Sequence, residues 1–170
     1  MLAPQRGLIA IGKKIEPKFN LGYQHSHRKQ GDMIVSKEKV LIVDDDVGVR
    51  EMMELTLIAD NYVVFAAEGA EKALEILIKE NLMVMFLDLK LPGMSGIDLC
   101  RRIRKENKVA IIHAITGYST HFTLLECREA GFDDYFIKPF DSNLLLKAAK
   151  EAFARLERWE VSPTLQYFKR

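Results

Sequence analysis

Five side chains that can bind a metal ion or a phosphate each lie at the end of a short apolar run: Asp44, Asp45, Asp88, Thr116 and Lys138. The clearest run is Met83-Val-Met-Phe-Leu87, which leads into Asp88 and is followed shortly by the turn pair Pro92-Gly93. Apolar runs rich in β-formers that end at a turn predict buried strands. We therefore expect three carboxylates, a hydroxyl and an ammonium group at strand ends.

Parallel strands place their carboxyl ends at one edge of a sheet, where open α/β sheets bind ligands. The five side chains should then converge on one pocket. At an effective dielectric constant near 20, two unit charges about 4 Å apart repel by about 4 kcal/mol, so three clustered carboxylates need a cation. An all-oxygen set of ligands favours Mg²⁺, which keeps some of its water and leaves room for a phosphate oxygen.

Apolar periodicity predicts the elements that position these groups. Strands are expected at 40–43, 62–65, 83–88, 109–115 and 135–137. Five helices are expected. The first two are at 47–59 and 69–79, and the third begins after a cap at Ser95. The fourth is at 120–130 and ends at Gly131, and the fifth runs from a cap at Asp141 or Ser142 to about Leu156. Strand and helix alternate five times, which predicts an α/β fold with a parallel sheet, right-handed crossovers and helices on both faces.

Composition limits the classes of partner. The 25 basic and 24 acidic residues give no overall field that would attract nucleic acid or a membrane, and no apolar run approaches the roughly 20 residues that span a bilayer. Cys100 and Cys127 lack metal spacing, which favours reduced thiols and a cytoplasmic protein. We expect a flexible N-terminal tail at 1–36, one domain at 37–158 and a short C-terminal tail at 159–170, with Met33 as an alternative start.

Four segments in this order resemble one known family. "LIVDDD", "MFLDLKLPGMSG", "IIHAITG" and "DDYFIKPF" resemble the receiver domain of two-component response regulators over about residues 37–158. The resemblance implies a doubly wound, flavodoxin-like fold with strand order 2-1-3-4-5. It also implies a signalling protein that catalyses only its own phosphorylation and slow dephosphorylation. Its expected partners are a histidine kinase or histidine phosphotransferase and a downstream protein, without direct DNA or membrane binding.

The resemblance also implies roles for single residues. Asp88 would accept a phosphoryl group, while Mg²⁺ would be held by Asp88 together with Asp44, Asp45 and the Lys90 carbonyl. Thr116 would bind a phosphoryl oxygen through its hydroxyl, and Lys138 would pair with the phosphate. Tyr135 would be the aromatic switch that turns inward on activation. This agrees with the chemistry of the residues, because Mg²⁺ and an ammonium group can neutralise a carboxylate and the incoming phosphoryl oxygens.

Other positions carry separate expectations. We assign Asp46 to capping the first helix, since it lies one residue beyond the matching acidic pair. His113 replaces the family's usual apolar residue and is expected to be a hydrogen-bonded core histidine rather than a second phosphoacceptor. The Lys138-Pro139 bond matches a position that is cis in the family. Lys90 and Tyr118 should shield an aspartyl phosphate from water, which favours a long lifetime and a phosphorelay intermediate, as in sporulation, over a chemotaxis-type regulator.

An apolar patch around the pocket is the expected docking surface for the kinase: Val49, Met52, Met53, Pro139 and Phe140. Three other functions compete with the receiver. A haloacid-dehalogenase-type phosphatase also uses an aspartyl nucleophile, but the later strand ends argue against it. A flavin-binding electron carrier would need a phosphate loop after the first strand. A degenerate receiver that only binds partners would lack one of the acids, Thr116 or Lys138.

Overall fold

A computed structural model describes residues 38–117 and 124–161. The elements alternate as predicted: β1 (Lys39–Val43), α1 (Val47–Ala59), β2 (Val63–Ala67), α2 (Ala70–Lys79), β3 (Val84–Asp88), α3 (Gly96–Glu106), β4 (Ile111–Gly117), α4 (Leu124–Ala130), β5 (Asp134–Lys138) and α5 (Ser142–Val161). The predicted tail at 1–36, the chain beyond 161 and the start of the fourth predicted helix lie outside the described residues. The predicted domain limits stay a prediction.

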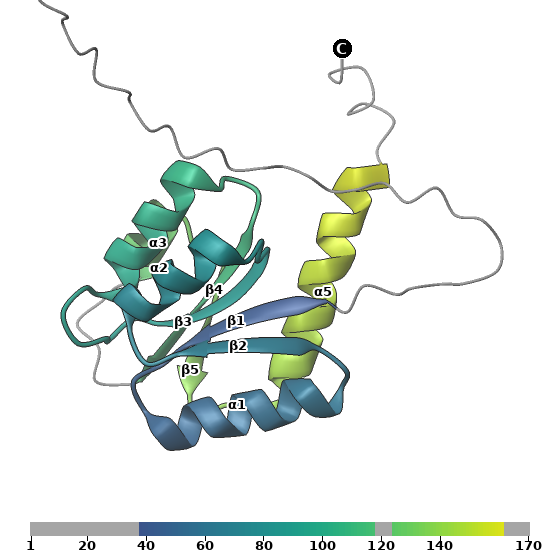
Figure 1. Ribbon diagram of the computed structural model, residues 1–170, viewed down its shortest axis with the longest axis horizontal. Helices are drawn as coiled ribbons and strands as arrows, with labels where there is room; N and C mark the ends of the chain where they lie inside the picture. Colours follow the sequence, from purple (N-terminus) through teal and green to yellow (C-terminus); the bar gives the residue numbers. More distant parts are fainter. Residues whose placement is uncertain (1–37, 118–123, 162–170) are drawn as a thin grey trace, which may run out of the picture. The chain divides into compact units, whose positions relative to one another are not determined.

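The strands form one parallel sheet in the order β2-β1-β3-β4-β5 (Figure 1). The expected doubly wound α/β fold and its strand order are confirmed. β3 lies at the centre, and all five of its residues are buried. Its last residue, Asp88, is therefore presented at the middle of the carboxyl edge of the sheet.

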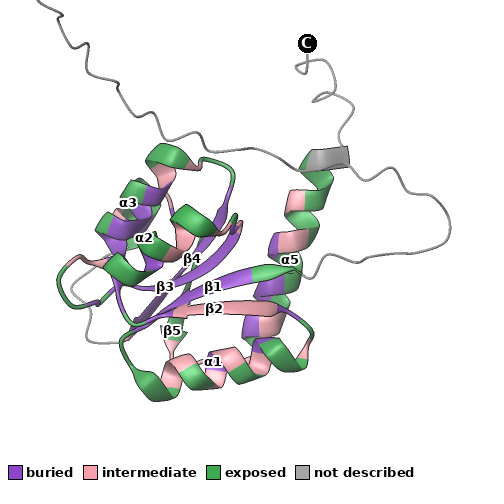
Figure 2. Cartoon of the chain, in the orientation of Figure 1, coloured by how far each residue is buried: buried purple, intermediate pink, exposed green. Residues whose placement is uncertain are grey.

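Helices cover both faces of the sheet. One core cluster joins α1 and α5 to the side chains of Val84 and Phe86, and a second joins α2, α3 and α4 to Met85 and Leu87. The alternation follows from the two-residue period of a strand. Burial is concentrated in the inner strands, and the helices turn exposed residues outward (Figure 2).

Local capping at the helix ends follows the sequence. Asp46 accepts a hydrogen bond from Val49 N at 3.0 Å and caps α1, and Ser95 accepts one from Asp98 N at 3.2 Å and caps α3. Gly131 has a φ of +101°, which lets it end α4 in the left-handed region. The Lys138-Pro139 bond is cis, as expected.

Some strand limits differ from the prediction. β4 begins at Ile111 rather than Val109, because the Asn107 side-chain oxygen accepts hydrogen bonds from Val109 N at 3.1 Å and Ala110 N at 3.0 Å and holds a turn there. β4 also runs on to Gly117, which pairs with Lys138. Thr116 accordingly lies inside β4, not after it. β2 likewise begins at Val63 and runs to Ala67, where the apolar pattern had indicated 62–65.

Among the helices of residues 38–117 and 124–161, none is both long and apolar enough to cross a bilayer.

Candidate functional site

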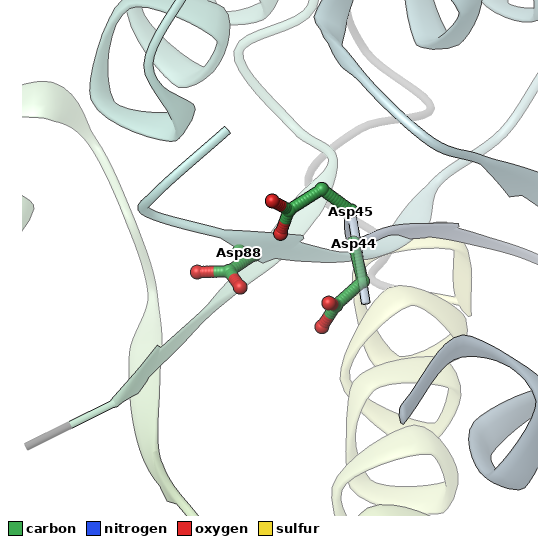
Figure 3. A group of neighbouring side chains, drawn as sticks. All are labelled: Asp44, Asp45 and Asp88. Carbon is green, nitrogen blue, oxygen red and sulfur yellow. The ribbon is translucent and has the colours of Figure 1, made fainter. Parts of the chain in front are cut away.

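Three carboxylates meet at the carboxyl edge of the sheet. Asp44 and Asp45 follow β1 and Asp88 ends β3, and Figure 3 shows them at neighbouring strand ends. One oxygen atom from each carboxylate lies within 4.8 Å of the others. Asp44 and Asp88 are buried and Asp45 is exposed, so the group opens to solvent on one side. The sequence prediction that these acids converge is thus met in the structure.

Lys138 reaches this group from the end of β5. Its Nζ lies 2.7 Å from Asp44 Oδ2 and 2.5 Å from Asp88 Oδ2, so one ammonium group joins two carboxylates. Burial would lower the pKa of Lys138, but the hydrogen bonds with Asp44 and Asp88 outweigh it and raise the pKa above its ordinary value. For Asp44, burial raises the pKa, and Lys138 offsets only part of that rise.

The charges of the site do not balance. Within the described residues, three carboxylates share the ammonium group of Lys138, so the group carries two negative charges in excess when all three are ionised. Converging carboxylate oxygens of this kind suit a hard divalent cation such as Mg²⁺. The residues therefore fit the metal implied by the sequence. Lys90 N donates to Asp88 Oδ1 at 2.9 Å, which keeps the main chain of Lys90 beside the acidic group.

The backbone behind Asp88 depends on a glycine to which no predicted role was attached, Gly96. Gly96 N donates to Leu89 O at 3.0 Å. A Cβ atom at Gly96 would overlap the Asp88 carbonyl oxygen and lie 2.9 Å from the Asp88 carbonyl carbon and the Leu89 Cα. Only glycine allows α3 to approach the strand end so closely. The signal available in the sequence was its place directly after the Ser95 cap.

Arg50 is a second residue that the motifs did not select. It lies in the first turn of α1, is half-buried, and donates a hydrogen bond from Nη1 to the Asp44 carbonyl oxygen at 2.6 Å. Its position shortly after an acidic triplet was the available signal. The opposite wall of the site is formed by β4, where Thr116 is buried and its Oγ1 donates to Gly117 O at 3.2 Å.

The predicted docking surface needs one correction. Met53 is fully buried in the core cluster between α1, α5 and the sheet, so it cannot belong to an exposed patch. Met53 and Leu57, four residues apart on one face of α1, are the buried residues of that helix and form its inward stripe. Val49, Met52 and Phe140 are half-buried and Pro139 is exposed, so these four stay candidates.

Lys90 and Tyr118 are expected to set the lifetime of the phosphate, and Tyr135 is the expected switch. The Lys90 side chain is exposed, and Tyr118 lies outside the described residues. Tyr135 is 38% exposed in this structure. Its inward turn on activation stays a prediction.

His113 is a core residue, as expected, but it is not hydrogen-bonded as predicted. Within the described part of the chain neither ring nitrogen has a hydrogen-bond partner. Its ring stacks on Phe86 with centroids 4.8 Å apart and lies 5.5 Å from the ring of Phe136. Aromatic neighbours offer no polar atoms, and burial lowers the pKa of His113 from its usual 6.5 to about 4.

Comparisons with known proteins agree with this geometry. The family model described as the response regulator receiver domain matches residues 40–150. The regulatory protein VanR of Enterococcus faecium is 35% identical over 122 residues, which are 72% of this chain and 52% of that protein. The chain spans about half the length of the first curated relatives that it matches.

Solved structures with the same fold cover a similar part of the chain. A response regulator of Chloroflexus aurantiacus has a TM-score of 0.65 and 35% identity, covering 69% of this chain and 98% of the other. A CheY-like receiver domain protein of Methanospirillum hungatei has a TM-score of 0.69 and 29% identity, covering 72% of this chain and 98% of the other. In both cases nearly the whole of the solved chain is matched.

Proposed function

The chain belongs to the response regulator receiver domain family, and from that membership we propose that Asp88 accepts a phosphoryl group from a phosphohistidine donor. The observation that carries the proposal is the arrangement of Asp44, Asp45 and Asp88 within 4.8 Å, with Lys138 joining two of them. Asp88 is the proposed acceptor because it ends the central strand, with Asp44 and Asp45 beside it.

Each residue has a part in the transfer. An oxygen of the Asp88 carboxylate attacks phosphorus, so an O–P bond forms while the N–P bond of the donor imidazole breaks. Lys138 is ion-paired with Asp88 before the transfer, and its ammonium group can pair with the negatively charged phosphoryl oxygens afterwards. Thr116, the last residue but one of the neighbouring strand β4, can donate its hydroxyl hydrogen to one of those oxygens. Asp44, Asp45, Asp88 and the Lys90 carbonyl would hold Mg²⁺, which would supply positive charge for the same oxygens.

The output is proposed to pass through protein contacts. A histidine kinase or phosphotransferase would dock beside the pocket on Val49, Met52, Pro139 and Phe140, and a downstream protein would read the phosphorylated state. We propose no DNA contact for this part of the chain, although relatives such as VanR are described as regulatory proteins. The proposed catalysis is limited to self-phosphorylation and slow dephosphorylation, without turnover of a separate substrate. The cytoplasm is the proposed compartment.

Labelling with acetyl phosphate and Mg²⁺ tests the central proposal. The wild type should gain one phosphoryl group at Asp88, Asp88→Asn should gain none, and no label should form when Mg²⁺ is chelated before acetyl phosphate is added. Asp98→Asn is the matched control, since Asp98 is an exposed acid in the first turn of α3. Equal labelling of Asp88→Asn and wild type would refute the assignment of the acceptor.

The phosphorelay role depends on the lifetime of the phosphorylated form. The exposed ammonium group of Lys90 can pair with phosphoryl oxygens, which carry about −1.5 to −2 charge. Tyr118 lies outside the described residues, and its bulky side chain is proposed, from its place two residues after Thr116, to exclude water. Lys90→Asn/Tyr118→Glu should therefore lose phosphate faster than wild type. An unchanged decay rate would remove the support for a relay intermediate and leave the chemotaxis-type regulator as the alternative.

A further inference from the structure

Arg50 binds the turn that carries the acidic residues out of β1. Its Nη1 donates to the Asp44 carbonyl oxygen at 2.6 Å, and its backbone N donates to the Asp46 carbonyl oxygen at 3.0 Å. Asp46 in turn caps α1 through Val49 N. The side chain and the main chain of Arg50 thus both hold the three residues between β1 and α1.

The Asp44 carbonyl lies where the sheet ladder ends. The last register pair between β1 and β3 joins Val43 to Leu87, while Asp44 N still donates to Ala67 O at 3.1 Å on β2. Asp44 also lies beyond the last register pair of the β1–β2 ladder, which joins Val43 to Ala67, so its carbonyl belongs to neither ladder and needs another donor. Arg50 supplies that donor, and the hydrogen bond is short and charge-assisted, which makes it strong. The last peptide group before Asp45 is therefore fixed by a side chain.

The hydrogen bond and the charge of Arg50 have opposite effects on a bound cation. Within the described residues Arg50 has no carboxylate oxygen within ion-pair distance, so its charge is not paired. A positive charge beside a cation site weakens cation binding by Coulomb repulsion. A hydrogen bond that holds the ligands in place strengthens it. The sign of the change on removing Arg50 therefore separates the two roles.

We propose that Arg50 is a positioning residue for the Mg²⁺ site: its bond to the Asp44 carbonyl holds the carboxylates of Asp44 and Asp45 in convergence before the cation arrives. This inference rests on the proposed function, because it concerns the same metal site. The loss of a residue that orients metal ligands typically weakens metal binding by about 10- to 100-fold. We expect the lower end of that range, because removal of the charge offsets part of the loss.

The test is a titration of the full chain with MgCl₂ at pH 7.5, followed by the amide NMR signals of residues 44–50. Arg50→Met should raise the Kd for Mg²⁺ about tenfold, although it removes a repelling charge. Arg102→Met is the matched control, because Arg102 is exposed on α3 and makes no ion pair with the described residues. Its Kd should equal that of the wild type. Arg50→Lys keeps the charge and one donor group and should recover part of the affinity.

Three outcomes are decisive. A Kd for Arg50→Met equal to or below that of the wild type overturns the proposal, since only the charge would then matter. An Arg50→Lys variant that binds Mg²⁺ more weakly than Arg50→Met overturns it as well, because the retained donor would provide no positioning. If the wild type itself shows no Mg²⁺-dependent shifts, the proposed function fails before Arg50 is tested. Urea unfolding of each variant, without Mg²⁺, verifies that the compared chains are folded.

Discussion

Replacing His113 with leucine should remove a sensitivity to acid that is built into the core. His113 is 6% exposed, stacks on Phe86 and faces Phe136. The charged groups that act on it are Asp133 and Asp134, which raise its pKa, and Arg155 on α5, which lowers it. Burial outweighs all three, so the folded protein holds the ring neutral at pH 7.

The magnitude follows from the difference between two pKa values. The pKa is about 4 in the folded protein and 6.5 for the usual exposed side chain. Below pH 6.5 the unfolded chain therefore binds more protons at this site than the folded chain, and stability is lost as the pH falls toward 4. At 1.36 kcal/mol per pKa unit the total loss is about 3 kcal/mol, of which about 2 kcal/mol is reached between pH 7 and pH 5.

The assay is urea unfolding of wild type and His113→Leu at several pH values from 7.5 to 4.5. The free energy of unfolding of the wild type minus that of the variant should fall by about 2 kcal/mol between pH 7 and pH 5. The subtraction cancels the contribution of other titrating groups, such as the buried carboxylates of the site. A difference that stays constant over this range would refute the reasoning, since it would mean that His113 titrates equally in both states.

Two further predictions concern positions where the packing leaves no freedom. Gly96→Ala should cost about 1–3 kcal/mol of stability or more, because its Cβ would overlap the backbone of β3. Gly48→Ala, where the nearest neighbour of the new Cβ lies at 3.4 Å, should be neutral or stabilising. Equal midpoints of urea unfolding for the two variants would contradict this. Arg104→Met should cost about 2–4 kcal/mol, because Arg104 donates hydrogen bonds of 2.7, 2.6 and 2.6 Å to two carbonyl groups and a carboxylate. Exposed Arg102→Met should change stability by less than about 0.5 kcal/mol, and a similar loss in both arginine variants would mean that the three bonds do not stabilise the fold.

The sequence by itself determined the alternation of elements and much of the local structure. Apolar periodicity depends only on neighbouring residues, so α1 was placed at Val47–Ala59 without any tertiary contact. The caps at Asp46 and Ser95 follow for the same reason, since each binds an N–H three residues away. The acids and Lys138 were found because each lies at the end of a recognisable strand. The strand order came from the resemblance to a family, not from periodicity.

Tertiary structure decided what each side chain meets. His113 was expected to be hydrogen-bonded, but the register places it beside Phe86 of β3, 27 residues earlier in the chain. Met53 is buried because the sheet and α5 cover that side of α1. Lys138 reaches Asp88 across a separation of 50 residues. Contacts of this kind depend on strand order and helix packing, which are properties of the whole chain, and a local pattern of residue types carries no information about them.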